Sequence, residues 1–123
     1  SEEHKDLVER IQGVLSDRVK EVKVTKRLTE SPACLVVGDY DMGQQMRKIM
    51  EAAGQPLPDA KPIFEINVDH PLLQRLEKEQ GEERFSDLAQ VIFDQATLAS
   101  GQEIEDPGTY VSRLNRLLLE LAE

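Results

Sequence analysis

The spacing of apolar residues predicts a helix at the start of the chain and three short strands before residue 69. Over about residues 3–15, apolar side chains recur every three or four positions, which is the repeat of an amphipathic helix. Residues 19–28 alternate between apolar and polar side chains, and residues 33–37 form a short, continuously apolar run. Each of these two segments is expected to be a strand, and residues 63–68 a third.

Three further helices are expected after the strands. Asp69-His70-Pro71 places proline in the first turn of one helix, and Gly81 separates that helix from a longer one that runs to about residue 100. Asp106-Pro107 caps the last helix. With one more helix between the second and third strands, the pattern indicates an α+β fold with a small three-stranded sheet and about five helices. A chain of 123 residues fits a single domain.

The two terminal helices carry more apolar surface than one small domain is expected to cover. Their short connector makes them antiparallel neighbours, and pairing with a second copy would bury the surplus in a four-helix bundle about a two-fold axis. We therefore divide the domain into an α/β body, residues 1–84, and dimerisation helices, residues 85–123. The expected interface residues are Phe85, Leu88, Ile92, Ala96, Tyr110, Val111, Leu114, Leu117, Leu118 and Leu121.

Two other arrangements of these helices stay open from the pattern alone. In one, the core of a single domain absorbs the whole apolar surface. In the other, the chain is a monomeric adaptor whose helical hairpin docks a different protein.

The helix expected between the second and third strands carries all three methionines on one face. Asp41 and Gln44 have the spacing of a capping box, and the helix is expected to end near Gly54. Its apolar stripe is typical of a core helix, but methionine also suits adaptable surfaces that bind many apolar partners. The pattern does not decide between core and binding surface. The candidate binding residues are Met42, Met46, Ile49 and Met50.

The net charge of −9 limits the classes of partner that the chain is expected to bind. Residues 1–27 carry seven basic and six acidic side chains, whereas residues 28–123 carry eight basic and eighteen acidic ones. Such a domain repels nucleic acid phosphates and anionic lipid heads, so we expect a protein partner, no nucleic acid and no membrane. The basic cluster near the first strand is expected to keep a sheet edge soluble. Its members are Arg18, Lys20, Lys23, Lys26 and Arg27.

Cysteine usage and the chain ends indicate a cytoplasmic fragment. Cys34 is the only cysteine, which excludes an intrachain disulfide and fits a reducing cytoplasm. No apolar run approaches the ~20 residues of a membrane span, and the first residues are too polar for a signal peptide. Ser1 stands where an initiator methionine would be, so we expect an excised domain of a larger protein.

The sequence predicts no catalytic, cofactor or metal site. Gly38 and Gly43 have the spacing of a phosphate-binding loop, but Gln44 and Gln45 follow where that loop needs lysine and then serine or threonine. Cys34 lies in an apolar run, where a buried thiol is inert. A small standalone cytosolic enzyme using Cys34 is therefore kept only as an alternative.

The two histidines offer equally little chemistry. His4 and His70 stand at unrelated positions and do not form a metal site. His70 is instead expected to start its helix through a hydrogen bond near the helix N-terminus.

The chain resembles the C-terminal domain of the heat-shock protein 90 chaperones in three segments. They are Phe64-Glu-Ile-Asn-Val-Asp-His-Pro71, Asp94-Gln-Ala-Thr-Leu-Ala-Ser-Gly101 and Ile104-Glu-Asp-Pro107, in matching order and spacing. The family's Asn-Pro-x-His-Pro segment appears as Asn67-Val-Asp-His-Pro71, with one proline replaced. The resemblance covers essentially the whole chain. Because no acidic docking tail follows Ala122, the chain is most similar to bacterial members.

The resemblance implies a cytoplasmic, ATP-dependent molecular chaperone that binds unfolded proteins and assists folding under stress. It assigns ATP, magnesium and the ATPase activity to other domains of the parent protein, so this chain itself would be no enzyme and hold no cofactor. It also implies that the terminal helices form a constitutive homodimer. The family's client-holding helix falls on Met42, Met46, Ile49 and Met50, which favours the binding surface over the core for this stripe.

Overall fold

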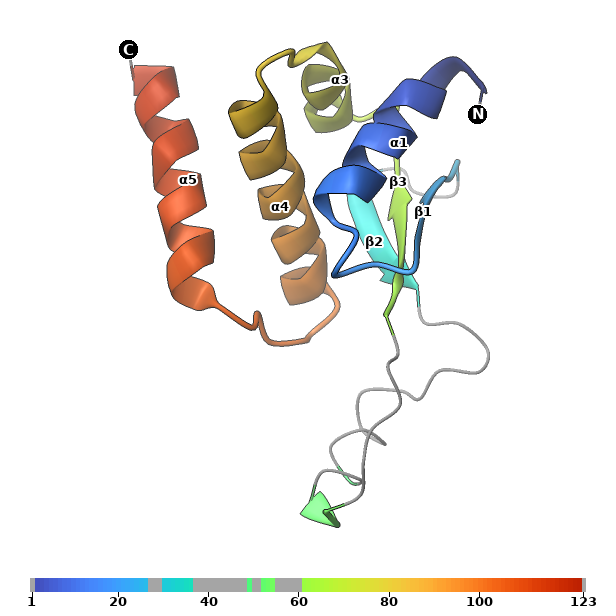
Figure 1. Ribbon diagram of the computed structural model, residues 1–123, viewed down its shortest axis with the longest axis vertical. Helices are drawn as coiled ribbons and strands as arrows, with labels where there is room; N and C mark the ends of the chain where they lie inside the picture. The colour runs from blue at the N-terminus through green and yellow to red at the C-terminus, as the bar shows by residue number, and fades with distance from the viewer. Residues whose placement is uncertain (1, 27–29, 37–48, 50–51, 55–60, 123) are drawn as a thin grey trace.

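The computed structural model describes the chain except for residues 1, 27–29, 37–48, 50–51, 55–60 and 123. One sheet and the helices that follow it make up most of the described part (Figure 1), so the predicted α+β class is confirmed. In chain order, the elements are η1 (Glu2–His4), α1 (Lys5–Val14), β1 (Glu21–Val24), β2 (Ala33–Val36), β3 (Ile63–Ile66), α3 (Pro71–Lys78), α4 (Glu82–Ala99) and α5 (Pro107–Ala122).

The sheet is mixed, with β3 in the centre. β1 lies parallel to β3 and β2 lies antiparallel to it. Phe64 pairs with Val22 on one side and Leu35 on the other, so these side chains share the face that meets the core. The predicted start of the first strand at Val19 is wrong. The Val19 N–H still bonds to the Leu15 carbonyl in a helical turn, and pairing with the sheet begins only afterwards.

The core lies between the sheet and two helices. α1 packs against β1 and α4 packs against β2. The rings of Phe64 and Phe93 meet edge to face with 5.3 Å between their centroids. Burying each large apolar side chain stabilises the fold by about 1.5–3 kcal/mol. The core includes Leu7, Ile11, Leu15, Val22, Phe64, Ile66, Leu73, Leu76, Phe85, Ile92 and Phe93.

A partly buried ion pair joins α4 to the segment that leads into β1. Asp94 is only 1% exposed, and its carboxylate accepts a hydrogen bond from Arg18 at 2.5 Å. The same guanidinium donates to Gln90 at 2.6 Å and lies over the ring of Phe93. The prediction that Arg18 belongs to a solvated sheet edge is therefore wrong, because its guanidinium pairs with a buried carboxylate. Lys23 on the edge strand β1 is exposed, as predicted.

Two predicted helix starts are confirmed. His70 precedes Pro71, and its Nδ1 accepts a hydrogen bond from the Leu72 N–H at 3.1 Å. The Asp106 carboxylate accepts from the backbone N–H of Thr109 at 3.1 Å and from its hydroxyl at 2.6 Å. Each cap satisfies backbone donors that have no partner within the helix.

Candidate functional site

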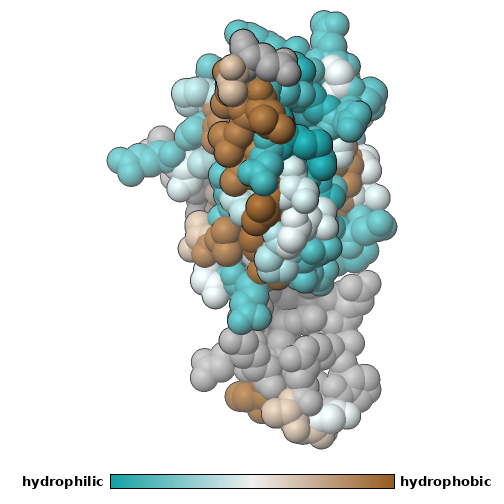
Figure 2. Space-filling model, turned by 90° about the vertical axis from the view of Figure 1, so that its left-hand side faces the viewer, coloured by the Kyte–Doolittle hydropathy of each residue, from teal (hydrophilic) through white to brown (hydrophobic). Residues whose placement is uncertain are grey.

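α5 is apolar along much of its length, yet none of its residues is buried. Val111, Leu118 and Leu121 are 50%, 51% and 84% exposed, whereas Leu114 is half-buried. Because these four residues follow spacings of three and four, they lie in one row, which we call the apolar face of α5. Figure 2 shows the row as a stripe of apolar side chains between polar margins. Exposed apolar rows of this kind mark interaction surfaces.

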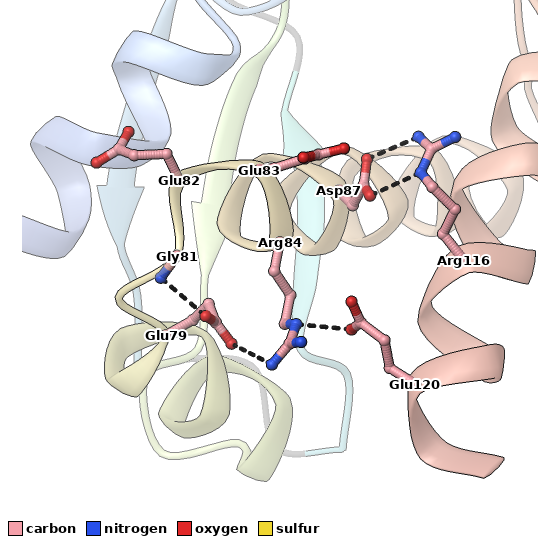
Figure 3. A pocket seen from close by; sticks show the side chains of 8 residues that line it. All are labelled: Glu79, Gly81, Glu82, Glu83, Arg84, Asp87, Arg116 and Glu120. Atoms are coloured by element: carbon pink, nitrogen blue, oxygen red, sulfur yellow. Dashed lines mark hydrogen bonds and ion pairs between the residues drawn. The ribbon is translucent and has the colours of Figure 1, made fainter. Parts of the chain in front are cut away.

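A second row on α5 is charged and contacts α4. The carboxylate of Asp87 accepts two hydrogen bonds from Arg116, at 2.9 and 3.0 Å, and lies 4.0 Å from Arg113. One turn earlier on α4, Nε of Arg84 lies 2.6 Å from Oε2 of Glu120 (Figure 3). The paired hydrogen bonds with Asp87 raise the pKa of Arg116 above its usual value. The predicted antiparallel hairpin is thus present, and ion pairs join its helices.

Glu79 holds the junction between α3 and α4. Its carboxylate accepts hydrogen bonds from the Gly81 N–H at 2.9 Å and from Arg75 at 2.8 Å, and Arg84 lies 3.7 Å away. The Gly81 hydrogen bond is the main reason why the pKa of Glu79 lies below its usual range, and Arg75 adds to the effect. Its backbone carbonyl also accepts from Arg10 at 2.9 Å, which links the junction to α1.

The junction and α5 border a charged crevice of about 510 Å³. Its two guanidiniums, on Arg84 and Arg116, are already paired with carboxylates. Figure 3 shows that these pairs connect α4 to the junction after α3 and to α5. The lining residues are Glu79, Gly81, Glu82, Glu83, Arg84, Asp87, Arg116 and Glu120.

Comparison with known proteins adds the family. The model of the family described as "Hsp90 protein" matches residues 1–122. The chain belongs to the Hsp90 family. It is also 52% identical over 122 residues to the "Chaperone protein HtpG" of Alkalilimnicola ehrlichii. That alignment covers 99% of this chain but only 19% of the relative, so the chain spans about a fifth of the relative's length.

The interface residues predicted for this Hsp90 chain fall into two groups in the structure. Phe85, Ile92 and Ala96 are buried in the chain's own core, and Leu88 packs against that core. Those three buried side chains have little surface left for a partner in the single chain, and the expected contact of the α4 stripe with a second copy stays a prediction. The α5 residues remain accessible. Tyr110, Leu114 and Leu117 are half-buried, and Val111, Leu118 and Leu121 are exposed.

Two exposed leucines on α4 and α5 lie outside the interface that the sequence pattern predicts. Leu98 of α4 is 48% exposed and Leu119 of α5 is 67% exposed, and neither was in the predicted interface. The helical spacing places Leu98 off the main apolar stripe of α4, and this position could have indicated its exposure. The ion pair between Asp87 and Arg116 was also missed, although opposite charges on two helices expected to be antiparallel could have suggested it.

Most of the predicted methionine helix of this Hsp90 chain lies outside the described residues. Met42, Met46 and Met50 all lie outside them, as do the expected cap at Asp41 and the loop from Gly38 to Gly43. Ile49 is described and is 56% exposed. The Ala53 N–H donates to the Ile49 carbonyl at 3.0 Å, and Gly54 follows with φ +74°. A left-handed glycine of this kind is typical of a helix end, as predicted here.

The remaining candidates for chemistry are placed as follows. Cys34 is half-buried, and its Sγ lies 3.7 Å from a carboxylate oxygen of Glu65. The expectation of a fully buried thiol is therefore wrong, because Cys34 lies on the face of β2 opposite the core residue Leu35. His4 contacts Glu77 at 2.9 Å. Within the described residues, no helix is both long and apolar enough to cross a bilayer.

Proposed function

We propose that this chain is the C-terminal homodimerisation domain of a bacterial, cytoplasmic, ATP-dependent Hsp90 chaperone. The apolar face of α5 would meet the same face of a second copy, with the exposed part of α4 alongside. Together the two hairpins would form a four-helix bundle about a two-fold axis.

The observation that carries this proposal is the exposure of α5. A helix with leucine or valine in almost every turn usually buries one side, yet α5 buries none of its residues within its own chain. Each such side chain contributes about 1.5–3 kcal/mol when fully removed from water. A second copy offers an identical apolar row, so a symmetric contact covers both rows at once.

Charge also favours contact through this face. A chain with a net charge of −9 repels its own copies at most of its surface. Val111, Leu114, Leu118 and Leu121 carry no charge, and the neighbouring charges of Arg116 and Glu120 are already paired with α4. The apolar face is thus a place where two copies approach without strong repulsion.

Membership of the Hsp90 family supports the function proposed for the whole protein. Because a relative named as a chaperone is about five times longer than the aligned region, we assign ATP, magnesium and ATP hydrolysis to the rest of the parent protein. This chain then has a mechanical role: it joins two chaperone arms. An isolated fragment would hold no cofactor of its own.

Sedimentation of the chain at micromolar concentration tests the dimer. We expect a dimer for the native chain and a monomer for Leu118→Asp, because burying an unpaired carboxylate in the interface costs several kcal/mol. Glu103→Gln, which alters an exposed residue outside both helices, serves as the control and should remain dimeric. A native chain that sediments as a monomer would contradict the proposal and favour a docking adaptor.

We also propose that the methionine helix binds unfolded client proteins. Support comes from the predicted stripe of Met42, Met46 and Met50 and from the 56% exposure of Ile49. Met46→Ser with Met50→Ser should weaken binding of a fluorescently labelled, reduced and alkylated unfolded protein, whereas Gln44→Ser should not. The dimer and the melting temperature should stay unchanged. A double variant that unfolds would instead place the methionines in the core.

A further inference from the structure

Two rows of opposite character border the side of α5 that rests on α4. One is the apolar face. The other, which we call the charged flank, consists of Arg113, Arg116 and Glu120. Its spacings of three and four place it in a single row. At ~100° per residue, the two rows lie on either side of the half-buried Tyr110 and Leu117.

The whole charged flank is attached to one turn of α4. Arg116 donates two hydrogen bonds to Asp87, and Arg113 lies 4.0 Å from the same carboxylate. Glu120 pairs with Arg84 at 2.6 Å. Because Arg84 and Asp87 are three residues apart, they lie on the same side of α4. The charged flank therefore contacts α4 through several atoms along about two turns of α5.

These pairs oppose a competing arrangement. If α5 rolled about its axis toward α4, Val111 and Leu118 would move from water to the surface of α4, which the hydrophobic effect favours. The same roll would pull Arg116 away from Asp87. Asp87 is only 8% exposed, so it would be left as a nearly buried carboxylate without its bidentate partner, which is strongly unfavourable.

We propose that the ion pairs from Arg84 and Asp87 to the charged flank fix the rotation of α5 and thereby hold its apolar face outward for a second copy. Asp87 and Arg116 are then positioning residues. The fixed rotation is a property of the single chain, whereas its use by a second copy rests on the proposed function.

The rotation is tested by measuring a distance inside one chain. Spin labels on cysteines at the exposed positions 95 and 112 would report it, in a Cys34→Ser background and diluted with unlabelled chain. We expect a single narrow distance. In Asp87→Asn and in Arg116→Gln it should broaden or shift by about 5 Å, because a helix with side chains is about 10–12 Å across.

Arg75→Gln is a closely matched control. Arg75 lies 2.8 Å from Glu79, with the two side chains 50% and 9% exposed, and Arg116 lies 2.9 Å from Asp87, with 50% and 11%. Only the second pair reaches α5. Arg75→Gln should therefore leave the distance unchanged even if it lowers the melting temperature as much as Arg116→Gln does. An unchanged distance in Asp87→Asn and Arg116→Gln overturns the proposal.

Sedimentation equilibrium of the same variants tests the consequence for the dimer. We expect Kd to rise at least about tenfold in Asp87→Asn and Arg116→Gln and to change less than about twofold in Arg75→Gln. A changed distance with an unchanged Kd overturns the role of the rotation in dimerisation. A native chain that is monomeric contradicts the proposed function, while the distances still decide the rotation. Should Asp87→Asn not fold, Arg116→Gln decides, because its side chain is half-exposed.

Discussion

α4 and α5 are antiparallel neighbours of similar length, but their apolar side chains have different surroundings. Nine of the 18 residues in α4 are buried, whereas none of the 16 residues in α5 is. α4 lies between the sheet and α5, so it has neighbours on two sides. α5 has α4 on one side and presents its apolar face to solvent on another (Figure 2).

The difference shows that one sequence pattern serves two purposes. Periodic apolar residues establish that a helix has an apolar side, but they do not say whether its partner belongs to the same chain. In α4 that side stabilises the fold directly. In α5 the apolar face stays exposed in the single chain, and under the proposed function its burial would contribute free energy on contact with a second copy. Ion pairs from Asp87 and Arg84 help to hold α5 against α4.

The largest expected effect is the difference in the free energy of unfolding between a truncated side chain in α4 and one in α5. Phe85→Ala in α4 should destabilise the chain by about 3–5 kcal/mol, because it empties a core site and removes the ring beneath Arg10. Leu118→Ala in α5 should change the stability of the single chain by less than about 0.5 kcal/mol, since the side chain is half-exposed there. Urea unfolding at protein concentrations below the dimer Kd measures both.

The same two variants should rank in the opposite order when the dimer dissociation constant is measured. Leu118→Ala should weaken association, and Phe85→Ala should leave it nearly unchanged wherever the chain is still folded. If Leu118→Ala instead destabilises the single chain as strongly as Phe85→Ala, then α5 packs inward and the contrast between the helices is wrong.

Much of the fold could be predicted because local chemistry decides it. His70 and Asp106 cap helices through contacts within three residues, and Gly81 and Gly54 interrupt helical patterns where the structure ends or begins a helix. The strand limits were less predictable. Val19 is apolar and fits a strand pattern, but its N–H completes the turn after α1.

The candidate site could be predicted only in part, because long-range contacts decide which apolar side faces solvent. Phe85 and Leu118 look alike in the pattern, yet β2 and α1 cover one side of α4, whereas no element in the described part of the chain covers the apolar face of α5. Arg18 shows the same limit for charges. Its position in a basic cluster suggested solvent, but Asp94, 76 residues later, binds it inside the fold.

The smallest expected effect is the change in stability when acid protonates the carboxylates at the starts of α4 and α5. The pKa of Glu79 at the start of α4 is lowered mainly by the Gly81 N–H, and the pKa of Asp106 at the start of α5 mainly by the Thr109 hydroxyl. A carboxylate whose pKa is lower in the folded chain stabilises that chain fully above its ordinary pKa of about 4. This contribution is lost as pH falls through the lowered value, because the unfolded chain then binds more protons.

Protonation of the two carboxylates should destabilise different parts of the chain. Protonation of Glu79 releases contacts to Arg75 and Arg84 at the base of the core helix α4, so Glu79→Gln should flatten the dependence of whole-chain stability on pH below about 4. Asp106 caps a helix with no buried residue, so its protonation should fray α5 and leave the core intact. Urea unfolding and amide hydrogen exchange across this pH range measure the two effects. If Asp106→Asn alters the unfolding midpoint as much as Glu79→Gln does, α5 is as firmly coupled to the core as α4.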